Sequence, residues 1–225
     1  MENLENASLP IIALIGGTGK EGPGLAMRWA HVGYPIVIGS RQLEKAQRIA
    51  SELNEKLGID TIRGLQNNDA VQRADICVLT VVYTAHEAAI RGLKDDLTGK
   101  ILVDTTARID FRAPKPPQAP SAARIAQDIV GAEVRVVAAF QNVPAHSLRK
   151  NIGGSIEADV LVCSDDPNAA HEIIKLAEAG GMRAYYAGNL DNAVVVEGLT
   201  SILISLNKHY GVKTASIGIS GLDNY

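Results

Sequence analysis

The feature that most constrains the fold of this chain is a short apolar run that ends in closely spaced glycines. Residues 11–15 predict a buried strand, and Gly17, Gly19 and Gly22 follow at the spacing G-x-G-x-x-G before a helix-periodic segment begins at Leu25. A strand, a glycine turn and a helix in this order form the dinucleotide-binding fingerprint. Its glycines permit the tight turn, the approach of the backbone to a pyrophosphate and close helix packing, while the helix N-terminus favours the phosphates. The alternative is a glycine-rich turn in another kind of α/β protein.

The end of the next strand indicates which dinucleotide is bound. Residues 35–39 predict this strand, and an Asp or Glu at its tip would bind the ribose 2′-hydroxyl of NAD and repel a 2′-phosphate. This chain has Ser40 and Arg41 at the tip and Lys45 one helical turn on, whereas Glu44 lies further into the helix. A guanidinium fork with a second cation suits a phosphate, so the sequence predicts NADP(H). The alternative is that both cations are ordinary solvated residues of a surface helix.

The composition excludes several other classes of protein. The formal net charge of the 225 residues is −3 and no basic run is present, which argues against a nucleic-acid surface. Residues 1–10 have no basic signal pattern and are expected to be a disordered lead-in, and no apolar run approaches the length of a membrane span. Cys77 and Cys163 lack the spacing of a zinc or redox site and are expected to be buried reduced thiols. We therefore expect a cytoplasmic protein with no metal, membrane or nucleic-acid partner.

Apolar runs that alternate with helical segments predict an α/β fold with a Rossmann-like, doubly wound parallel sheet. After the first two strands, further strands are expected at residues 61–65, 76–82, 101–105 and 134–139, and residues 67–69 are expected to cap a helix. The final third predicts a smaller α/β unit with strands at 159–163 and 183–187 and a long helix at 189–210. The apolar face of this helix closes the cleft or pairs with a second subunit, so a homodimer is expected. The predicted domains are a lead-in at 1–10, an NADP-binding Rossmann domain at 11–145 and a C-terminal domain at 146–225.

Ligands of doubly wound sheets bind beyond the carboxyl ends of the strands. The segments at these ends are residues 80–86, 104–109 and 141–145, and they are the candidates for ligand contact. His86 and His146 lie in or next to these segments and could touch substrate, although a hydrogen-bonded structural histidine is the simpler interpretation of each. No arrangement of residues indicates a catalytic triad.

Residues 108–121 predict a long proline-rich loop, because their four prolines exclude a helix or a central strand. A loop of this length inside a compact domain is usually functional or disordered. It carries Arg108, Arg112 and Lys115, with Arg124 just beyond, against a single acidic residue. One hypothesis is that this loop is a basic lid over an anionic substrate, and the alternative is a solvated connector.

Several segments together resemble the sequences of a known family. They are residues 16–22 (Gly-Gly-Thr-Gly-Lys-Glu-Gly), 39–41 with Lys45, 136–145 (Val-Val-Ala-Ala-Phe-Gln-Asn-Val-Pro-Ala), 159–166, 187–192 and 196–200 (Val-Glu-Gly-Leu-Thr). From about Ile11 to Gly211 the chain resembles the NADPH-dependent reductases of the deazaflavin coenzyme F-420 (F420 below), also called 8-hydroxy-5-deazaflavin:NADP oxidoreductases. The Asn-Val-Pro-Ala and Glu-x-Leu-Thr segments are more specific to this family than the glycine segment.

The resemblance implies an oxidoreductase that transfers a hydride between NADP(H) and F420, with the deazaflavin stacked on the nicotinamide in the cleft. No catalytic side chain is expected, because the protein needs only to hold the two rings together and exclude water. The expected NADP(H) contacts are Gly17, Thr18, Gly19, Lys20, Glu21, Gly22, Ser40, Arg41, Lys45, Thr80, Val81, Val82, Tyr83 and Ala145. The expected deazaflavin contacts are Thr105, Arg112, Gln141, Asn142, Val143 and Pro144.

The chain departs from the family pattern in three places, which are Lys20, the Val82-Tyr83 pair and Gln141. Two alternatives therefore stay open. One is an NADPH-dependent reductase of another small acceptor, such as a flavin, an imine or a ferric chelate. The other is a non-catalytic NADP(H) sensor whose terminal helix meets a partner protein.

Overall fold

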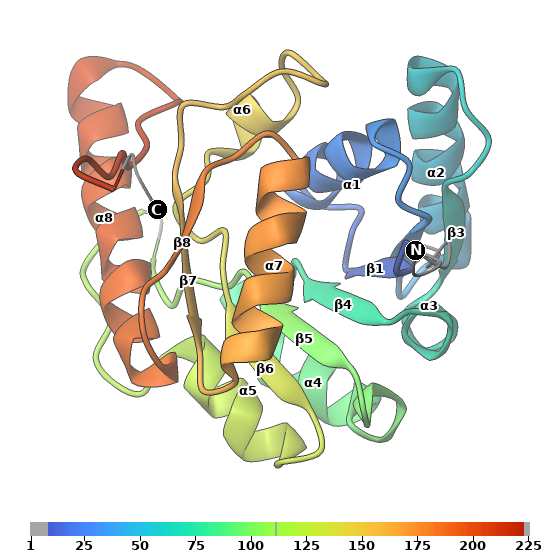
Figure 1. The fold of residues 1–225 in the computed structure, drawn as a ribbon, viewed down its shortest axis with the longest axis horizontal. Coiled ribbons are helices and arrows are strands. Elements are labelled where there is room, and N and C mark those ends of the chain that lie inside the picture. The colour runs from blue at the N-terminus through green and yellow to red at the C-terminus, as the bar shows by residue number, and fades with distance from the viewer. Residues whose placement is uncertain (1–8, 111, 223–225) are drawn as a thin grey trace, which may run out of the picture.

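The computed structural model describes residues 9–110 and 112–222 and is built around an eight-stranded sheet in the order β3-β2-β1-β4-β5-β6-β7-β8 (Figure 1). The first six strands are parallel and follow the order of dinucleotide-binding folds, so the predicted Rossmann-like architecture is confirmed. Their bounds are β1 Ile12–Ile15, β2 Ile36–Ser40, β3 Arg63–Gln66, β4 Ile76–Leu79, β5 Ile101–Asp104 and β6 Arg135–Ala138. Residues 1–8 of the predicted lead-in lie outside the described residues.

Helices cover both faces of this sheet, and each face has its own apolar core. Alternate residues of β1 show the division, since Ile12 and Leu14 belong to one core and Ala13 and Ile15 to the other. The first core is closed by α1 (Gly22–His31), α2 (Leu43–Leu57) and α7 (Pro167–Ala179). The second is closed by α3 (Asn67–Arg73), α4 (Tyr83–Leu93) and α5 (Ala122–Val130). Because both faces are covered, the central strands β1 and β4 are apolar throughout rather than alternating with polar residues.

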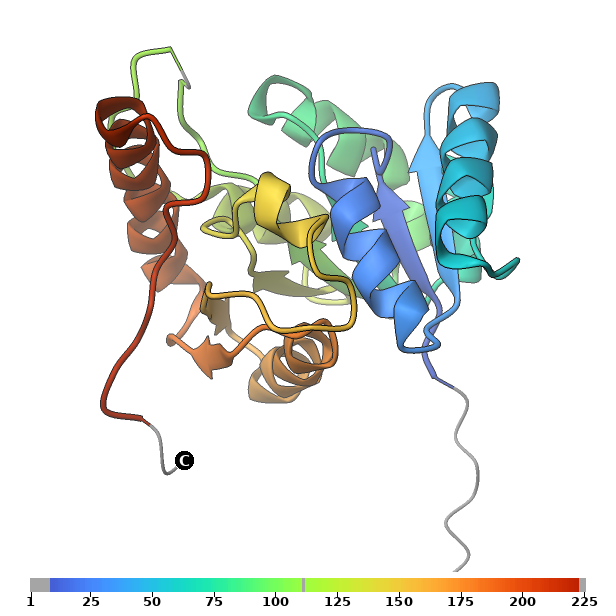
Figure 2. The same ribbon diagram turned by 90° about the horizontal axis from the view of Figure 1, so that it is seen from above.

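The C-terminal third extends the same sheet but reverses its direction. Strand β7 (Val160–Ser164) pairs antiparallel with β6, and β8 (Ala184–Tyr186) pairs parallel with β7. Three further elements complete this part, namely the short helix α6 (Ala145–Leu148), the 3-10 turn η2 (Leu190–Asn192) and the long helix α8 (Ala193–Tyr210). A second 3-10 turn, η1 (Asp95–Leu97), lies between α4 and β5. Seen from above in Figure 2, α6 lies between α1 and α8.

Contrary to the expectation that no segment could span a membrane, the segment Leu190–Tyr210 is long and apolar enough to do so by length and composition alone. Only 33% of its most apolar window is buried. One side of α8 nevertheless packs on the body of the protein through Val196, Glu197, Ser201 and Leu203. A packed helix of a soluble protein meets the same criterion, so length and composition do not decide between these two roles.

Two of the differences from the predicted boundaries affect the site. Strand β4 ends at Leu79 rather than continuing to Val82, because Thr80 leaves the sheet and donates both its N–H (2.9 Å) and its Oγ1 hydroxyl (3.0 Å) to Ile15 O. Asn67 was expected to cap a helix, but it is the first residue of α3 and its Oδ1 accepts a hydrogen bond from Gly16 N at 3.3 Å. Asn67 therefore supports the glycine loop.

Candidate active site

The glycine loop, residues 16–21, closes over the carboxyl end of β1. Gly16 adopts the left-handed backbone conformation (φ 69°), and a Cβ on Gly17 would lie 2.6 Å from Leu14 O, so the tight turn requires both glycines. A side chain on Gly22 would collide with Gly17, whose Cα and O lie 2.6 Å from the position of a Cβ. At Gly19 the nearest atoms would be 3.7 Å away, so protein packing alone does not require a glycine there. The open space above Gly19 fits a bound pyrophosphate, as the fingerprint predicts.

The tip of β2 lies directly beside this loop, because Gly17 N donates to Gly39 O at 3.0 Å. Ser40 is buried and its Oγ accepts a backbone N–H at 3.1 Å, whereas Arg41 and Lys45 are exposed. The tip therefore offers a guanidinium and an ammonium to solvent next to the glycine loop. This arrangement suits the 2′-phosphate of NADP(H).

The segment after β4 borders the glycine loop from the other side. Val81 lies so close to Gly16 that a Cβ on this glycine would meet the Val81 Cγ1 at 2.7 Å. Val82 is 68% exposed, which is unusual for a valine that follows a central strand. Tyr83 begins α4, and the Arg108 guanidinium lies 5.3 Å from the centroid of its ring. An exposed valine and a cation-capped tyrosine at a strand end form a surface on which a ring could pack.

A buried carboxylate–imidazole pair lies beneath this edge. His86 on α4 and Asp104 at the end of β5 have no exposed surface, and the His86 Nε2 to Asp104 Oδ2 distance is 2.6 Å. Asp104 Oδ1 also accepts the N–H of Thr106 at 2.9 Å. His86 therefore holds the loop after β5 in place, and its complete burial supports the structural interpretation rather than substrate contact.

Glu21 reaches from the glycine loop to the end of β5. Its Oε2 lies 3.4 Å from the Oγ1 of Thr105, and its Oε1 is buried with no hydrogen-bond partner. Burial raises the pKa of Glu21 to about 8, and the Thr105 contact offsets only part of this rise. A neutral carboxyl group at pH 7 thus lies between the dinucleotide loop and the predicted deazaflavin contact Thr105.

The loop after β6 is attached to α8. Thr200 accepts a hydrogen bond from Asn142 Nδ2 at 2.9 Å and donates one to Gln141 O at 3.1 Å. Just before these residues, Phe140 has a left-handed backbone (φ 72°), which costs a non-glycine residue free energy and is frequent at functional sites. The ring of Phe140 packs edge-on against Trp29 with centroids 5.8 Å apart. The contacts of Phe140, Asn142 and Thr200 therefore hold the strained turn in one conformation.

Glu197 on α8 performs the same function for the loop after β5. Its Oε1 accepts the N–H of Ala122 at 2.6 Å and its Oε2 accepts the N–H of Arg108 at 3.3 Å, and the residue is fully buried. Burial raises the pKa of Glu197 to about 7, although the two N–H groups lower it. Glu197 and Thr200 thus join the carboxyl ends of two neighbouring strands to one helix, which explains physically why the Glu-x-Leu-Thr pattern accompanies the Asn-Val-Pro-Ala segment.

Buried polar atoms without a partner gather at this edge of the sheet. Within residues 9–110 and 112–222, every buried side-chain nitrogen or oxygen that lacks a hydrogen bond belongs to a loop or helix start after β1, β4, β5 or β6. These atoms are Glu21 Oε1, His86 Nδ1, Thr106 Oγ1, Arg108 Nε, Gln141 Oε1 and Asn142 Oδ1. Folded proteins normally satisfy such atoms, so their concentration here fits an edge that is completed by a polar ligand.

Comparisons with known proteins agree with this geometry. Residues 11–108 match the family model described as NADP oxidoreductase, coenzyme F420-dependent. The chain is 38% identical over 221 residues to the F420-dependent NADP reductase of Methanothermobacter thermautotrophicus, covering 94% of this chain and 95% of that one. It is 37% identical to the F420-dependent NADP reductase of Methanocaldococcus jannaschii, covering 94% and 99% of the two chains. The chain belongs to the F420-dependent NADP reductase family.

A solved structure extends the likeness to the fold. The crystal structure of a candidate F420-dependent NADP-reductase from Arthrobacter sp. FB24 has a TM-score of 0.79 and covers 95% of this chain and all of that one. At 24% sequence identity this similarity concerns the fold alone. Metalloreductase STEAP3 of Rattus norvegicus is 26% identical over 183 residues, which is 35% of its own length.

The structure also places the remaining residues that were expected to contact ligands. Thr18 is half-buried and Lys20 exposed, and the carbonyl of Lys20 accepts a hydrogen bond from Arg149 Nη2 at 2.8 Å. Val143 is buried, while Pro144 precedes α6 and Ala145 begins it. Arg112 is exposed and its carbonyl accepts a hydrogen bond from Lys208 Nζ at 3.1 Å. Lys208 lies eight residues, or about 12 Å, further along α8 than Thr200, so Arg112 stays a prediction outside the main group.

The proline-rich loop has no regular secondary structure within residues 108–110 and 112–121, as predicted. Arg108 is bound to this loop itself, since its Nη1 donates to Gln118 O (3.1 Å) and to Pro120 O. Arg124 is paired with Asp165 at 2.8 Å and with Asp191 at 3.0 Å. Two of the four cations that suggested a basic lid are therefore occupied within the protein, which leaves Arg112 and Lys115 to test the hypothesis.

Two residues that hold the strand-end loops, Glu197 and Thr200, were not among the expected ligand contacts. Their partners lie between 58 and 89 residues away along the chain, so no local pattern identifies them. Only the Glu-x-Leu-Thr resemblance pointed to them. His146 is exposed on α6 and has no described contact with the group around Thr105.

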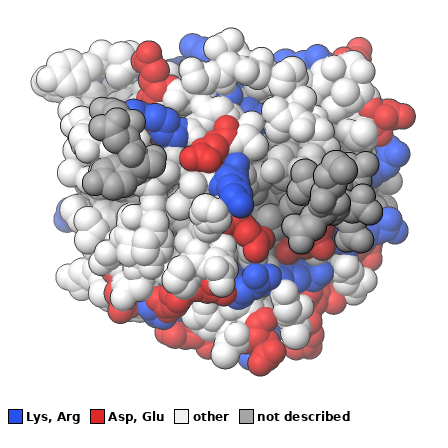
Figure 3. Space-filling model, in the orientation of Figure 1, with Lys and Arg blue, Asp and Glu red and all other residues white. Residues whose placement is uncertain are grey.

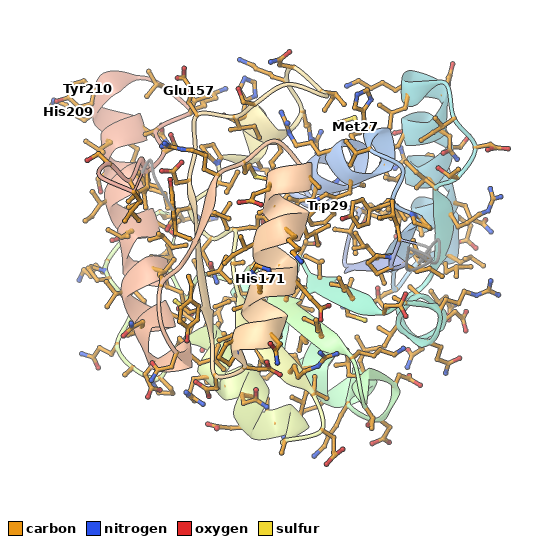
Figure 4. The ribbon with its side chains drawn as sticks, in the orientation of Figure 1. Met27, Trp29, Glu157, His171, His209 and Tyr210 are labelled. Atoms are coloured by element: carbon orange, nitrogen blue, oxygen red, sulfur yellow. The ribbon has the colours of Figure 1, made fainter. Side chains whose placement is uncertain are left out.

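A large cavity of about 1200 Å³ lies elsewhere, between α7, β8 and the C-terminal segment, and none of the expected ligand contacts lines it. Figure 4 shows His171 on α7 in this part of the molecule, and His209 and Tyr210 at the far end of α8. Across the described ranges, no three His, Cys, Asp or Glu side chains are placed to hold a metal ion. Both cysteines are free and buried, as expected.

Proposed function

We infer that this protein is an oxidoreductase that transfers a hydride between NADP(H) and coenzyme F420. The observation that carries this conclusion is its membership of the F420-dependent NADP reductase family along nearly the whole chain. The edge described above supports it, because a glycine loop, a cationic strand tip and two strand-end loops joined by α8 meet there. When bound, the two cofactors supply the redox chemistry, and the protein orients them and excludes water.

In this proposal residues 17–22 hold the pyrophosphate and Ser40, Arg41 and Lys45 hold the 2′-phosphate. Residues 80–83 and Ala145 line the nicotinamide half, which extends from β1 toward β4 and β5. The free space above Gly19 and the exposure of Arg41 support this assignment.

The deazaflavin site is proposed at Thr105 and residues 141–144, with Arg112 at its outer end. The strained backbone at Phe140 and the anchoring of Asn142 by Thr200 support a preorganised surface there. The unpartnered Gln141 Oε1 and Asn142 Oδ1 are acceptors that a ligand N–H could satisfy.

The direct test mixes the purified protein with NADPH and oxidised F420 and follows the loss of the deazaflavin's visible absorbance. Rapid bleaching with NADPH and little with NADH would support both the reaction and the assignment of Arg41. No bleaching, with NADPH still bound, would contradict the proposed acceptor and favour another acceptor or an NADP(H) sensor.

A second experiment tests the basic lid. Arg112 and Lys115 lie on a surface loop beside the end of α8. If this loop is a basic lid over the anionic substrate, neutralising both residues together should raise the KM for F420 and leave the KM for NADPH unchanged. The matched control neutralises Lys56 on α2 and Arg63 on β3. Both are exposed cations, and β3 is the edge strand on the opposite side of the sheet from β8. Unchanged constants in the lid variant would favour the solvated connector.

We also propose that the protein is a cytoplasmic homodimer whose residues 11–145 bind NADP(H) and whose residues 146–225 close the cleft and form the dimer. Large exposed apolar side chains on α8 and just after it support this. They are Val195, Ile202, Leu206, Tyr210 and Val212. Acidic and basic side chains are interspersed on the face shown in Figure 3, so this face carries no continuous basic patch of the kind that binds nucleic acid. Light scattering of the protein without detergent tests the dimer.

A further inference from the structure

The carboxyl group of Glu21 is placed in a way that binding a pyrophosphate does not require. Glu21 is the residue that precedes α1, yet its side chain makes no hydrogen bond to the first turn of the helix. It points instead to Thr105 Oγ1 at 3.4 Å and leaves Oε1 buried and unpartnered. A carboxyl group at the start of a helix is ordinarily ionised, because the helix dipole stabilises its charge.

The hydrogen bond from Thr105 stabilises an ionised Glu21 only weakly. Thr105 Oγ1 lies 3.0 Å from Leu79 O and 3.4 Å from Glu21 Oε2. A hydroxyl group has one proton, and the closer carbonyl competes for it, so little of its hydrogen-bonding capacity reaches the carboxylate. A protonated Glu21 can instead donate to Thr105 Oγ1. The rise in the pKa of Glu21 to about 8 that burial causes agrees with this geometry.

The position of Glu21 in the sheet indicates which half of the dinucleotide it faces. Strand β1 lies between β2, whose tip carries Arg41, and β4, which is followed by β5 and Thr105. The adenine ribose binds at the tip of β2, so the nicotinamide half extends to the other side. Glu21 contacts the β5 side and therefore lies beside the nicotinamide half.

Among the described residues no cation forms an ion pair with Glu21. On β5 and α4, Asp104 and His86 are paired with each other. On α8, Glu197 is bound to two backbone N–H groups. The cations Lys20, in the loop itself, and Arg149, after α6, are exposed, and Arg149 donates to the carbonyls of the loop. The start of α1 contributes a partial positive charge that favours the carboxylate without forming a pair with it.

We propose that Glu21 is a proton-linked positioning residue that makes the protein distinguish NADP⁺ from NADPH. The oxidised nicotinamide ring carries a positive charge that the reduced ring lacks. A cation beside Glu21 favours its carboxylate, whereas the neutral reduced ring leaves it protonated. In going from the NADPH complex to the NADP⁺ complex, the O–H bond of Glu21 breaks heterolytically and the proton passes to solvent. The inference rests on the proposed NADP(H) site and on no property of the F420 site.

The test is isothermal titration calorimetry of NADP⁺ and NADPH at pH 7.0 in two buffers with different ionisation enthalpies, which gives the number of protons released on binding. We expect the wild type to release up to about one proton more with NADP⁺ than with NADPH. Taking the difference between the two nucleotides cancels protons from the 2′-phosphate, which they share. Glu21→Gln should abolish the difference, and Glu44→Gln, at an exposed acid near the 2′-phosphate end, should retain it.

The affinities supply a second measurement that does not depend on the folding of a variant. Between pH 6 and pH 9 the wild-type Kd for NADP⁺ should fall relative to the Kd for NADPH, by about tenfold for each unit by which NADP⁺ lowers the pKa of Glu21. Equal proton numbers for the two nucleotides, a constant ratio of Kd values, or an undiminished difference in Glu21→Gln would overturn the inference. Failure to bind either nucleotide would overturn the NADP(H) site itself, whereas binding without F420 reduction leaves this test valid.

Discussion

Two ionisable side chains, Glu21 just before α1 and Arg28 within it, have opposite environments. Glu21 has one contact at 3.4 Å and an unpartnered oxygen. Two turns later, Arg28 is 2% exposed and every nitrogen of its guanidinium has an acceptor. The acceptors are the carbonyls of Leu148 (3.0 Å), Gly154 (2.8 Å), Gly180 (2.9 Å), Lys150 (2.7 Å) and Asn151 (3.4 Å).

This difference separates a structural ionisable group from a functional one. The partners of Arg28 come from the segment after α6 and from the end of α7, so this side chain ties the C-terminal third to α1. Burial lowers its pKa, and the carbonyl dipoles stabilise the charge that remains. Within the described residues Glu21 lacks such partners, as expected if a ligand completes its environment as proposed above. Saturated hydrogen bonding marks the first kind of site and unsaturated hydrogen bonding the second.

The largest effect on stability should come from replacing Arg28, whose hydrogen bonds are all satisfied. Arg28→Met leaves five carbonyls without their donor, and we expect the free energy of unfolding to fall by about 4 kcal/mol. Urea denaturation measures this loss. Arg48→Met on α2 is the control, because the Arg48–Glu52 ion pair is exposed and should contribute less than about 1 kcal/mol. Equal losses in the two variants would mean that Arg28 is not structural.

The second effect is a dependence of stability on pH, which Glu21 should cause. The pKa of Glu21 is about 8 in the folded protein and near 4.5 when unfolded, so between these values the folded state binds more protons. The free energy of unfolding should therefore fall as pH rises from 4.5 to about 8 and level off above, by a few kcal/mol at most. Glu21→Gln should flatten the curve of Tm against pH. A slope below pH 7 should remain from Glu197, whose pKa is about 7. An unchanged slope would contradict the buried, neutral state of Glu21.

A smaller effect should distinguish two glycines of the same loop. Gly19→Ala meets no protein atom within 3.7 Å, so Tm should stay constant while the Kd for NADPH rises about tenfold, or about 1.4 kcal/mol. Gly92→Ala on α4, where a Cβ would meet nothing within 4 Å, is the control and should leave the Kd unchanged. Calorimetry and thermal unfolding measure both quantities. A fall in Tm without a change in Kd would assign Gly19 to the structural group.

The smallest effect concerns the exposed cation at the tip of β2. Arg41→Gln should raise the Kd for NADPH about fivefold, or about 1 kcal/mol, because a solvated charge contributes modestly, and it should leave the Kd for NADH unchanged. Arg48→Gln, one turn further along α2 than Lys45, is the matched control. An equal change for NADPH and NADH would exclude recognition of the 2′-phosphate by Arg41.

The sequence was sufficient for the parts of the site that depend on local spacing. The glycine loop and the tip of β2 both follow from short patterns, and the structure places them side by side. The end of β4 was predicted three residues too late, because Val81 and Val82 continue a β-branched run and only the hydrogen bonds of Thr80 to Ile15 show where the chain turns.

The rest depends on contacts between distant residues. Nothing around Arg28 in the sequence indicates that its acceptors lie 120 to 152 residues away. Glu21 was expected to contact NADP(H) from its place in the loop, but its protonation depends on Thr105, 84 residues further along the chain. Burial and long-range hydrogen bonding decide which charges are structural, and neither is encoded in a local pattern.

The reversal of β7 has a consequence for how this fold can be recombined. Because β7 and β8 run opposite to the first six strands, their carboxyl ends lie at the edge of the sheet away from the glycine loop. The last third therefore reaches the nucleotide edge through α8 and the segment before β7, and contributes no strand-end loop. In chimaeras that exchange only α8 between homologues, the preference for the hydride acceptor should therefore change. The choice between NADP and NAD should stay that of the homologue that supplies the rest of the chain.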